Sequence, residues 1–395
     1  MQVPLLDLKA QYQTLREQIR AEVDAVMDSQ QFILGSKVES FERAVCEYTG
    51  SPHAIGVTSG TDALLIVLMA LGIGPGDAVL TTPFTFFGTA GSIARTGAAP
   101  VFIDIDEATF NLCPKALAEY LEAAPRNAEG KPLSHEGKVI RAIMPVHLYG
   151  LCAAMDEINA TAAKFGLPVI EDAAQALGAV YPSADGTAHP AGAVADFGTY
   201  SFFPSKNLGA FGDGGMVVCK DAKAAETIRA LRNHGGERRY YHRLIGGNFR
   251  LDALQAAILE IKLPHLDLWS ASRRRNAALY REAIASNGLG SILTLPTEPY
   301  AASGQENHHI FNQFVIRAPR RDDLCQRLES EKIGHAIYYP LPLHLQECFG
   351  YLGYKQGDFP KAEKAALETL ALPIFPELVP DQIHRVVEVI RDFYC

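Results

Sequence analysis

The chain has 395 residues, of which 48% are hydrophobic and 21% charged, and its 36 basic and 45 acidic residues give a net charge of −9. This composition is typical of globular proteins and excludes wholesale disorder, and the length predicts two domains at roughly 100–200 residues each. A negative chain without a long basic run also argues against nucleic acid as a partner.

The sequence contains no expected membrane segment. Its longest apolar run, residues 63–74, is shorter than the roughly 20 residues that span a bilayer, and the N-terminal residues lack the regions of a signal peptide. The seven cysteines are scattered without a Cys-x-x-Cys pair, which favours reduced thiols over a disulfide scaffold or a zinc site. We therefore expect a cytoplasmic protein that binds no metal and contacts no membrane.

The first predicted element is a helix over residues 12–30, where Leu15, Ile19, Val23 and Val26 share one face. Short β-rich runs then alternate with helical stretches up to about residue 260, and most runs are almost continuously apolar. Strands that are covered on both faces have this composition, so we predict a mostly parallel sheet between helical layers. The predicted strands are residues 54–57, 78–80, 101–103, 142–144, 168–170, 198–203 and 216–218.

A smaller α+β unit is predicted after the alternation stops. We expect the chain to divide into a large domain, residues 1–255, and a small C-terminal domain, residues 256–395, and we expect residues 182–190 to form an exposed loop. The elements predicted for the small unit are helices over 266–286, 321–332 and 360–371, and strands over 311–316 and 336–339.

The first segment with chemical character is Thr58–Asp62, between a predicted strand and the apolar helix from Ala63. A glycine-containing turn into a helix presents free N–H groups, and the helix dipole favours an anion there. The segment therefore fits a phosphate cradle, although Ser59 and Asp62 fit an ordinary helix cap as well. It matches neither the P-loop pattern nor the Gly-x-Gly-x-x-Gly pattern of nicotinamide sites.

Two further segments supply an acid and an amine. Asp172 follows a predicted strand, where ligands of α/β sheets bind, so its carboxylate either pairs with a cationic ring nitrogen or begins a helix. Lys206 lies in an apolar, glycine-rich stretch, where desolvation would favour the neutral amine that forms a Schiff base; the alternative is a surface lysine. The fourth segment, residues 246–259, is by itself an ordinary capped helix after a Gly-Gly-Asn loop.

Together these segments supply the groups that pyridoxal phosphate (PLP) chemistry needs: a phosphate cradle, an acid for the ring nitrogen and an amine for the aldehyde. Asp172 and Lys206 are separated by 34 positions, which leaves room for a strand, a helix and a loop. Both side chains can therefore reach one ring.

Seven motifs along the chain resemble the DegT/DnrJ/StrS sugar aminotransferases. The resemblance covers nearly the whole chain, from Pro4 to Pro340. It implies an α/β fold of PLP-dependent fold type I: a three-layer α/β/α large domain with a mixed, mostly parallel seven-stranded sheet, and a smaller α+β domain. The motifs are residues 60–64 (GTDAL), 83–86 (PFTF), 101–106 (VFIDID), 147–150 (HLYG), 171–175 (EDAAQ), 201–206 (SFFPSK) and 248–252 (NFRLD).

The resemblance implies roles around the cofactor ring. Lys206 would bind PLP covalently and act as the general acid and base. Asp172 would pair with the pyridine nitrogen, and Gln175 would contact the hydroxyl side of the ring. Phe86 would stack on the ring face, where the family often has tyrosine or tryptophan.

The resemblance also implies how the phosphate is held. Gly60, Thr61 and Ser201 would bind it from the same chain. Asn248 would reach it from the partner subunit, because these enzymes are usually homodimers with shared active sites.

Lys206 favours transamination, because relatives with histidine at this position are dehydratases or deoxygenation enzymes. The GDGG of residues 212–215, the PSKNLG of residues 204–209 and the stretch 238–242 resemble members that aminate C3 of UDP-linked N-acetyl sugars. We therefore expect transfer from L-glutamate to a UDP-3-keto-N-acetylhexosamine or its uronate, in cell-surface polysaccharide or lipid A biosynthesis. C4 amination or a dTDP-linked sugar is the alternative.

Three other functions are weighed against this one. A PLP-binding regulator would bind the cofactor without amino transfer, a nicotinamide dehydrogenase would need the missing glycine pattern, and a fold type I enzyme acting on amino acids alone is not excluded by spacing. Residues that would bind a diphosphate, or equally lie on a solvated surface, are Arg232, His234, Arg238, Arg239, Arg250, His308 and His309, and Tyr338 and Tyr339 would flank the nucleotide or pack beside Pro340.

Overall fold

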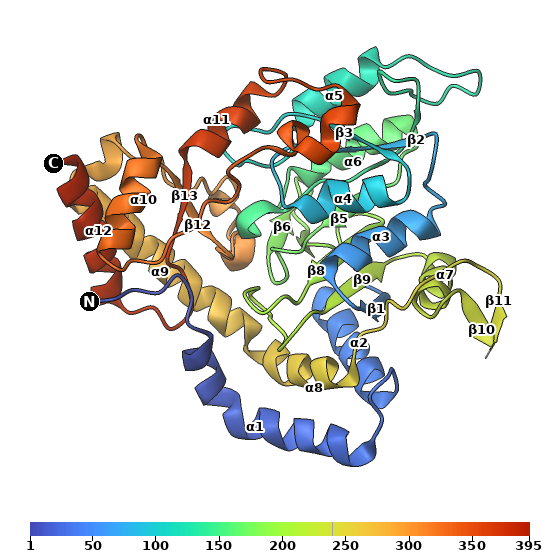
Figure 1. Ribbon diagram of the computed structural model, residues 1–395, viewed down its shortest axis with the longest axis horizontal. Helices are drawn as coiled ribbons and strands as arrows, with labels where there is room; N and C mark the ends of the chain where they lie inside the picture. The colour runs from blue at the N-terminus through green and yellow to red at the C-terminus, as the bar shows by residue number, and fades with distance from the viewer. Residues whose placement is uncertain (239) are drawn as a thin grey trace.

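A twisted sheet of seven strands forms the centre of the computed structural model, which describes residues 1–238 and 240–395 (Figure 1). Isolated parallel bridges, Ile143 with Val169 and Val146 with Asp172, join a four-stranded and a three-stranded portion. The resulting order is β1-β9-β8-β5-β4-β2-β3, in which β9 is antiparallel to both neighbours and the other pairs are parallel. The strands are β1 (His53–Val57), β2 (Asp77–Thr81), β3 (Ala99–Phe102), β4 (Val139–Ile143), β5 (Ile170–Asp172), β8 (Phe197–Ser201) and β9 (Gly215–Cys219).

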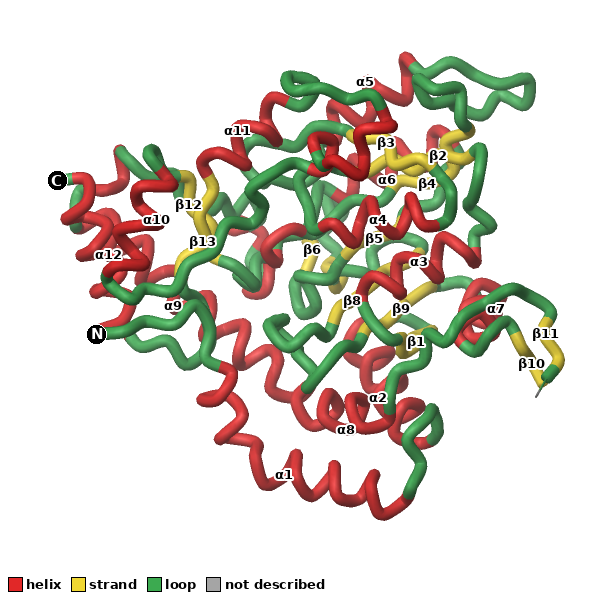
Figure 2. The backbone as a smooth tube through the Cα atoms, in the orientation of Figure 1, coloured by secondary structure: helices red, strands yellow, loops and turns green. Residues whose placement is uncertain are grey.

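Helices cover both faces of this sheet, as the red segments in Figure 2 show. On one face lie α3 (Gly60–Ala70), α4 (Phe87–Arg95) and α7 (Ala222–Arg232), and on the other lie α2 (Ser36–Thr49), α5 (Pro114–Ala123), α6 (Met155–Phe165) and α8 (Ala253–Lys262). Helix α3 is buried along most of its length because nearly all of its residues are apolar. The outermost helix, α1 (Leu8–Ser29), starts at an Asp7 cap and lays Leu15, Ile19 and Val26 against α8.

The C-terminal part has a second hydrophobic core around a two-stranded antiparallel ladder. Its elements are α9 (Leu266–Ser286), β12 (Phe314–Arg317), α10 (Arg321–Ser330), α11 (Pro360–Glu368), β13 (Thr369–Leu372) and α12 (Pro380–Tyr394). The N-terminal segment belongs to this core, because Val3 is fully buried there and bridges to Ile333. Both chain ends therefore lie on the same side of the molecule (Figure 1).

The predicted three-layer arrangement and mixed seven-stranded sheet are confirmed, and the helix predicted over 266–286 has those bounds. The division at residue 255 stays a prediction. In the structure, α8 lies against α1 and α2 of the large domain, whereas α9 reaches from Trp269 in the first core to Tyr280 in the second.

Several predicted boundaries in the C-terminal part were wrong. Residues 336–339 are not a strand, because only Ala336 bridges to Ala371 and Tyr338 turns its carbonyl toward the Tyr149 hydroxyl. The predicted helix 360–371 ends at Glu368, since the following buried residues pair with β12. The strand predicted over 311–316 begins at Phe314, after Phe311 adopts a left-handed backbone.

The predicted loop 182–190 is largely a hairpin. Strands β6 (Val180–Pro182) and β7 (Ala188–Pro190) pair antiparallel, and only residues 183–187 form the exposed turn. A second hairpin, β10 (Gly236–Arg238) and β11 (Tyr241–His242), extends from the body beyond α7 (Figure 1).

Candidate active site

A cavity of about 690 Å³ opens at the carboxyl ends of the parallel strands. Residues from both parts of the chain line it, from Ser59 at the end of β1 to Gln346. Seven of the predicted site residues lie around this one cavity, namely Gly60, Thr61, Phe86, Asp172, Gln175, Ser201 and Lys206. Asn248, the eighth, does not line the cavity of its own chain.

The turn from β1 into α3 combines a helix cap with a close backbone approach. Ser59 Oγ accepts a hydrogen bond from Asp62 N at 3.1 Å, so the ordinary cap is present. The next residue, Gly60, leaves no room for a side chain, because a Cβ there would lie 2.7 Å from Ser201 Cβ. The first turn of α3 therefore packs directly against Ser201, and both line the cavity, where the N-terminus of α3 suits an anion.

Asp172 ends β5 with a buried carboxylate. Thr89 Oγ1 donates to Asp172 Oδ2 at 2.7 Å, and Ala174 N donates to Oδ1 at 3.2 Å. Burial raises the pKa of Asp172, and the Thr89 hydroxyl and the Lys206 ammonium oppose this shift. Thr89 lies in the first turn of α4, and sequence reasoning missed it because only the fold brings α4 beside β5.

Lys206 lies on a tight loop between β8 and β9. Main-chain bonds from Lys206 N to Phe203 O, at 2.9 Å, and from Ala210 N to Phe202 O, at 2.8 Å, close the loop. The half-buried side chain lines the cavity and makes no hydrogen bond within the described residues. Burial lowers the pKa of its amine to about 8, and Asp172 acts in the opposite direction.

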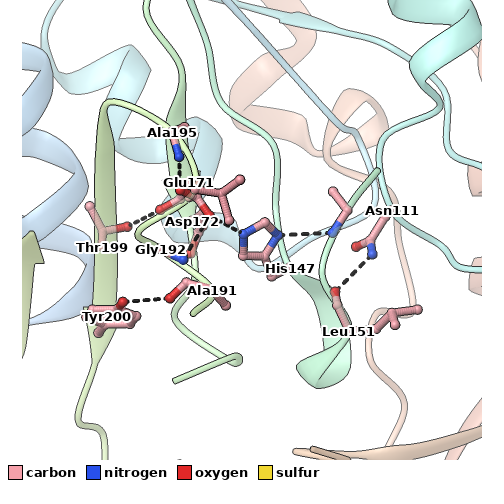
Figure 3. A network of polar contacts seen from close by, with 12 residues as sticks. Asn111, His147, Leu151, Glu171, Asp172, Ala191, Gly192, Ala195, Thr199 and Tyr200 are labelled. Atoms are coloured by element: carbon pink, nitrogen blue, oxygen red, sulfur yellow. Dashed lines mark hydrogen bonds and ion pairs between the residues drawn. The ribbon is translucent and has the colours of Figure 1, made fainter. Parts of the chain in front are cut away.

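A fully buried pair, His147 and Glu171, lies behind Asp172 (Figure 3). Ala153 N donates to His147 Nδ1 at 3.1 Å, so Nε2 carries the ring proton and donates to Glu171 Oε2 at 2.7 Å. Glu171 also accepts two peptide N–H bonds, from Gly192 at 2.8 Å and Ala195 at 2.6 Å. The pair therefore fixes the end of β5 from which Asp172 projects.

Gln175 is held between the two parts of the chain. Its Oε1 accepts a hydrogen bond from Tyr149 N at 2.7 Å, and its Nε2 donates to Tyr339 OH at 3.1 Å. Phe86, 58% exposed, lies at the mouth of the cavity with its ring centroid 6.4 Å from that of Tyr339. The residues around Tyr339 thus contribute an aromatic wall to the cavity.

Those predicted diphosphate ligands that the structure describes do not line this cavity. Arg232 is buried and pairs with Glu42 at 2.5 Å, because it crosses between α7 and α2 in the core. His309 is buried and stacks on Phe311, and His308 pairs with Glu298 at 2.9 Å. Of the remaining candidates, Arg250 donates to Asn233, His234 and Arg238 lie on the surface, and Arg239 lies outside the described residues.

Two features are absent from the described residues. No cluster of three or more His, Cys, Asp or Glu side chains there is arranged to hold a metal ion. No helix in that part of the chain has the length and apolar character needed to cross a bilayer.

The residues around the cavity fit pyridoxal phosphate. The first turn of α3, which the missing side chain of Gly60 allows to pack against Ser201, suits a phosphate, the buried Asp172 carboxylate suits a cationic ring nitrogen, and Lys206 offers an amine without a hydrogen-bond partner in the described chain. These three groups line one cavity, so a single cofactor that needs all three fits them better than separate small ligands do.

Comparison with known proteins supports the same assignment. The model of the DegT/DnrJ/EryC1/StrS aminotransferase family matches residues 13–391. A "pleiotropic regulatory protein" of Geobacillus stearothermophilus is 48% identical over 100% of this chain and 99% of its own length.

Two named transaminases match almost as extensively. The UDP-N-acetyl-3-dehydro-α-D-glucosamine 3-aminotransferase of Acidithiobacillus ferrooxidans is 42% identical over 98% of this chain and 97% of its own. The dTDP-3-amino-3,4,6-trideoxy-α-D-glucose transaminase of Streptomyces venezuelae is 39% identical over 99% of this chain and 96% of its own length.

Among solved structures, S. venezuelae DesV in complex with a ketimine intermediate superposes with a TM-score of 0.89 at 38% identity, covering 99% of this chain and 98% of that one. The fold, the cavity and these matches agree. The chain therefore belongs to the DegT/DnrJ/EryC1/StrS aminotransferase family and is a PLP-dependent sugar aminotransferase of fold type I.

Proposed function

We propose that the protein transfers an amino group from L-glutamate to the C3 ketone of a UDP-linked 3-keto-N-acetylhexosamine or its uronate, for cell-surface polysaccharide or lipid A synthesis. The observation that carries the reaction class is the Lys206 amine, desolvated and unbonded in the described chain, in the same cavity as the buried Asp172. The sugar class is supported by the A. ferrooxidans relative, which is named for a UDP-linked 3-dehydro sugar. A cytoplasmic location stays a prediction.

PLP, when bound, supplies an electron sink that stabilises the carbanion formed as the amino group moves. Asp172 would hold a proton on the ring nitrogen. Thr89 and Ala174 each bond one of its carboxylate oxygens and fix its orientation. The carboxylate is buried beside Thr89 at the end of β5, so water does not compete with these hydrogen bonds.

Lys206 would carry the proton between the two carbon atoms that exchange it. The pKa of this amine, about 8, lies close to neutral pH. The amine can therefore accept and return a proton with a small free-energy cost in either direction. The closed loop 202–210 holds its backbone in place. The ring of Phe86 would cover the cofactor face and exclude water from one side.

The phosphate would lie on the first turn of α3, between Gly60, Thr61 and Ser201. Asn248 is proposed to reach it from the partner subunit of a homodimer. This proposal is supported by its position next to Asn233, away from the cavity of its own chain.

Two alternatives have specific support. The S. venezuelae relative favours a dTDP-linked sugar, while amination at C4 stays open. The name of the G. stearothermophilus relative, a pleiotropic regulatory protein, supports a regulatory role.

The experiment that tests the proposal follows the visible spectrum of the PLP-loaded protein. Glutamate is expected to remove the band of the Lys206-linked cofactor, and a UDP-3-keto sugar is expected to restore it. Lys206→Ala is expected to lose turnover by more than about a thousandfold, because nucleophile and proton carrier are the same group. Reverse-direction assays with 2-oxoglutarate, comparing UDP- and dTDP-linked amino sugars, would identify the nucleotide.

A spectrum that glutamate leaves unchanged would contradict the donor. Bound PLP with no amino transfer to any sugar tested would favour the regulatory alternative.

A further inference from the structure

Tyr149 fixes the orientation of the Gln175 amide. Its peptide N–H is a donor only, so the Gln175 atom 2.7 Å away is the carbonyl oxygen Oε1. Tyr149 is buried and has a left-handed backbone with φ of 60°, and its hydroxyl donates to Tyr338 O. One residue thus sets the direction of the amide and anchors the segment that carries Tyr339.

The direction of the amide sets the direction of the Tyr339 hydroxyl. With Oε1 turned toward Tyr149, the other end of Gln175 is the NH₂ group, which cannot accept a hydrogen bond. Gln175 Nε2 therefore donates to Tyr339 OH at 3.1 Å, and the phenolic proton points elsewhere. No acceptor in the described chain takes that proton, and Tyr339 lines the cavity.

The position of Tyr339 identifies the group that receives the proton. Its ring centroid lies 6.2 Å from that of Phe84 and 6.4 Å from that of Phe86. The side chain is on the Gln175 side of the cavity, which is the side proposed for the ring hydroxyl of PLP. A phenolate oxygen there is an acceptor that a tyrosine hydroxyl would satisfy.

We propose that Tyr339 donates a hydrogen bond to the phenolic oxygen of the cofactor ring, beside Gln175, and stabilises the anionic form of that oxygen. This inference rests on the proposed function, because the ring is placed by Asp172 and Lys206. It assigns to the 338–340 segment a contact with the cofactor rather than with the nucleotide.

The charges around Tyr339 keep it a donor. Burial raises the pKa of its phenol, Asp172 acts in the same direction, and the bond from Gln175 opposes both. The hydroxyl therefore stays protonated at neutral pH. The titratable groups that line the cavity with it or act on its pKa are Asp172 on β5, Lys206 and Asp213 on the loop between β8 and β9, and the adjacent Tyr338, while Tyr149 after β4 contacts the same segment.

The test is a spectroscopic pH titration of the PLP-loaded protein without substrate. In Tyr339→Phe the ring oxygen loses a donor and becomes more basic, so it holds the proton shared with the Lys206 nitrogen more tightly. The midpoint of the spectral change is expected to rise by about one pH unit, and the Kd of the apoprotein for PLP to rise about tenfold. Tyr300→Phe is the matched control, because its hydroxyl bonds Ala153 O outside the cavity.

A second variant keeps the phenol and reverses its direction. In Gln175→Glu the carboxylate accepts from Tyr339, so the phenolic proton no longer reaches the ring. Adding Tyr339→Phe to this background is expected to move the midpoint by less than about a third of the shift seen in the wild-type background.

Two results would overturn the inference. One is an unchanged midpoint and PLP affinity in Tyr339→Phe. The other is a change confined to KM for the sugar, which would place the hydroxyl on the substrate. Wild-type protein that takes up no PLP would overturn the proposed function as well, so the two failures are distinguishable.

Discussion

Lys206 shows how burial alone gives one side chain a new chemistry. Its charge is disfavoured because the cavity removes water, and the single nearby carboxylate, Asp172, compensates only in part. The amine is consequently neutral in a substantial fraction of molecules near pH 8, whereas an exposed lysine would be almost fully protonated.

We expect the rate of PLP capture by the apoprotein to follow this titration. The neutral amine is the nucleophile, so the rate should rise about fivefold from pH 7 to pH 8 and less than about twofold from pH 8 to pH 10. Stopped-flow absorbance would measure it. Asp172→Asn removes the group that raises the pKa of Lys206, so the midpoint should move to lower pH. A rate that keeps rising tenfold per unit up to pH 10 would contradict a desolvated amine.

Residue types alone were enough to find part of this site. Lys206 and Asp172 became candidates in combination with the turn at Gly60, because each alone also fits a surface lysine or an acid that begins a helix. The sequence does not mark Thr89, and it marks Tyr339 only as a residue that would flank the nucleotide or pack beside Pro340. The fold brings each of them to a hydrogen-bond partner 83 or 164 positions away in sequence, which their local sequence does not indicate.

Two side chains of helix α8 hydrogen-bond to the loop that carries Lys206. Gln255 Oε1 accepts from Phe211 N at 2.8 Å, and Lys262 Nζ donates to Gly209 O. Lys262 is 3% exposed and forms no ion pair within the described residues. Burial lowers the pKa of its amine to about 8, with Glu377 opposing.

This lysine makes stability depend on pH in a defined window. Between pH 8 and the ordinary lysine value of about 10.5, the unfolded chain binds more protons than the folded one, so stability rises with pH. Relative to Lys262→Met, the free energy of unfolding of the wild-type apoprotein should rise by about 1.5 kcal/mol from pH 8 to pH 9.5. Urea denaturation at each pH would measure the difference.

Lys220→Met is the matched control for this experiment. Its ammonium is exposed and also donates to a single carbonyl, Val194 O at 2.9 Å. The free energy of unfolding of Lys220→Met should depend on pH in the same way as that of the wild type. Parallel curves for the wild type and Lys262→Met would show that Lys262 titrates like a surface lysine.

For helices and strands, the sequence predicted an element well where its local hydrophobic pattern alone decided the structure. Strand β9 is a continuous apolar run, and α9 has a long helical pattern without a competing partner. The prediction failed where tertiary pairing decided the outcome. Residues 369–372 follow α11 without a break in composition, and only their ladder with β12 makes them a strand.

At the scale of the whole molecule, one predicted site residue, Asn248, does not line the cavity of its own chain. Asn248 lies in the loop before α8, near a hairpin whose Tyr241 is 75% exposed and which is followed by Ile245 at 93% exposure. Exposed apolar side chains beside a residue with a proposed phosphate contact favour an interface with a second copy of this chain.

Mixed dimers would test whether the sites are shared. A Lys206→Ala chain paired with an Asn248→Ala chain contains one site with both native residues, so a statistical mixture should recover roughly a quarter of wild-type turnover. The control pairs Lys206→Ala with the double variant, which leaves no complete site. Activity that equals the sum of the separate homodimers would contradict sharing.

The cavity has a consequence for the lifetime of the protein. Its walls come from chain segments between Ser59 and Gln346, so a fragment that lacks either end of this range contains no complete site. A cofactor that binds only the assembled walls shifts the equilibrium away from every partly opened form, by an amount set by its concentration over its Kd. Vitamin B6 supply would thereby govern resistance to proteolysis as well as catalysis.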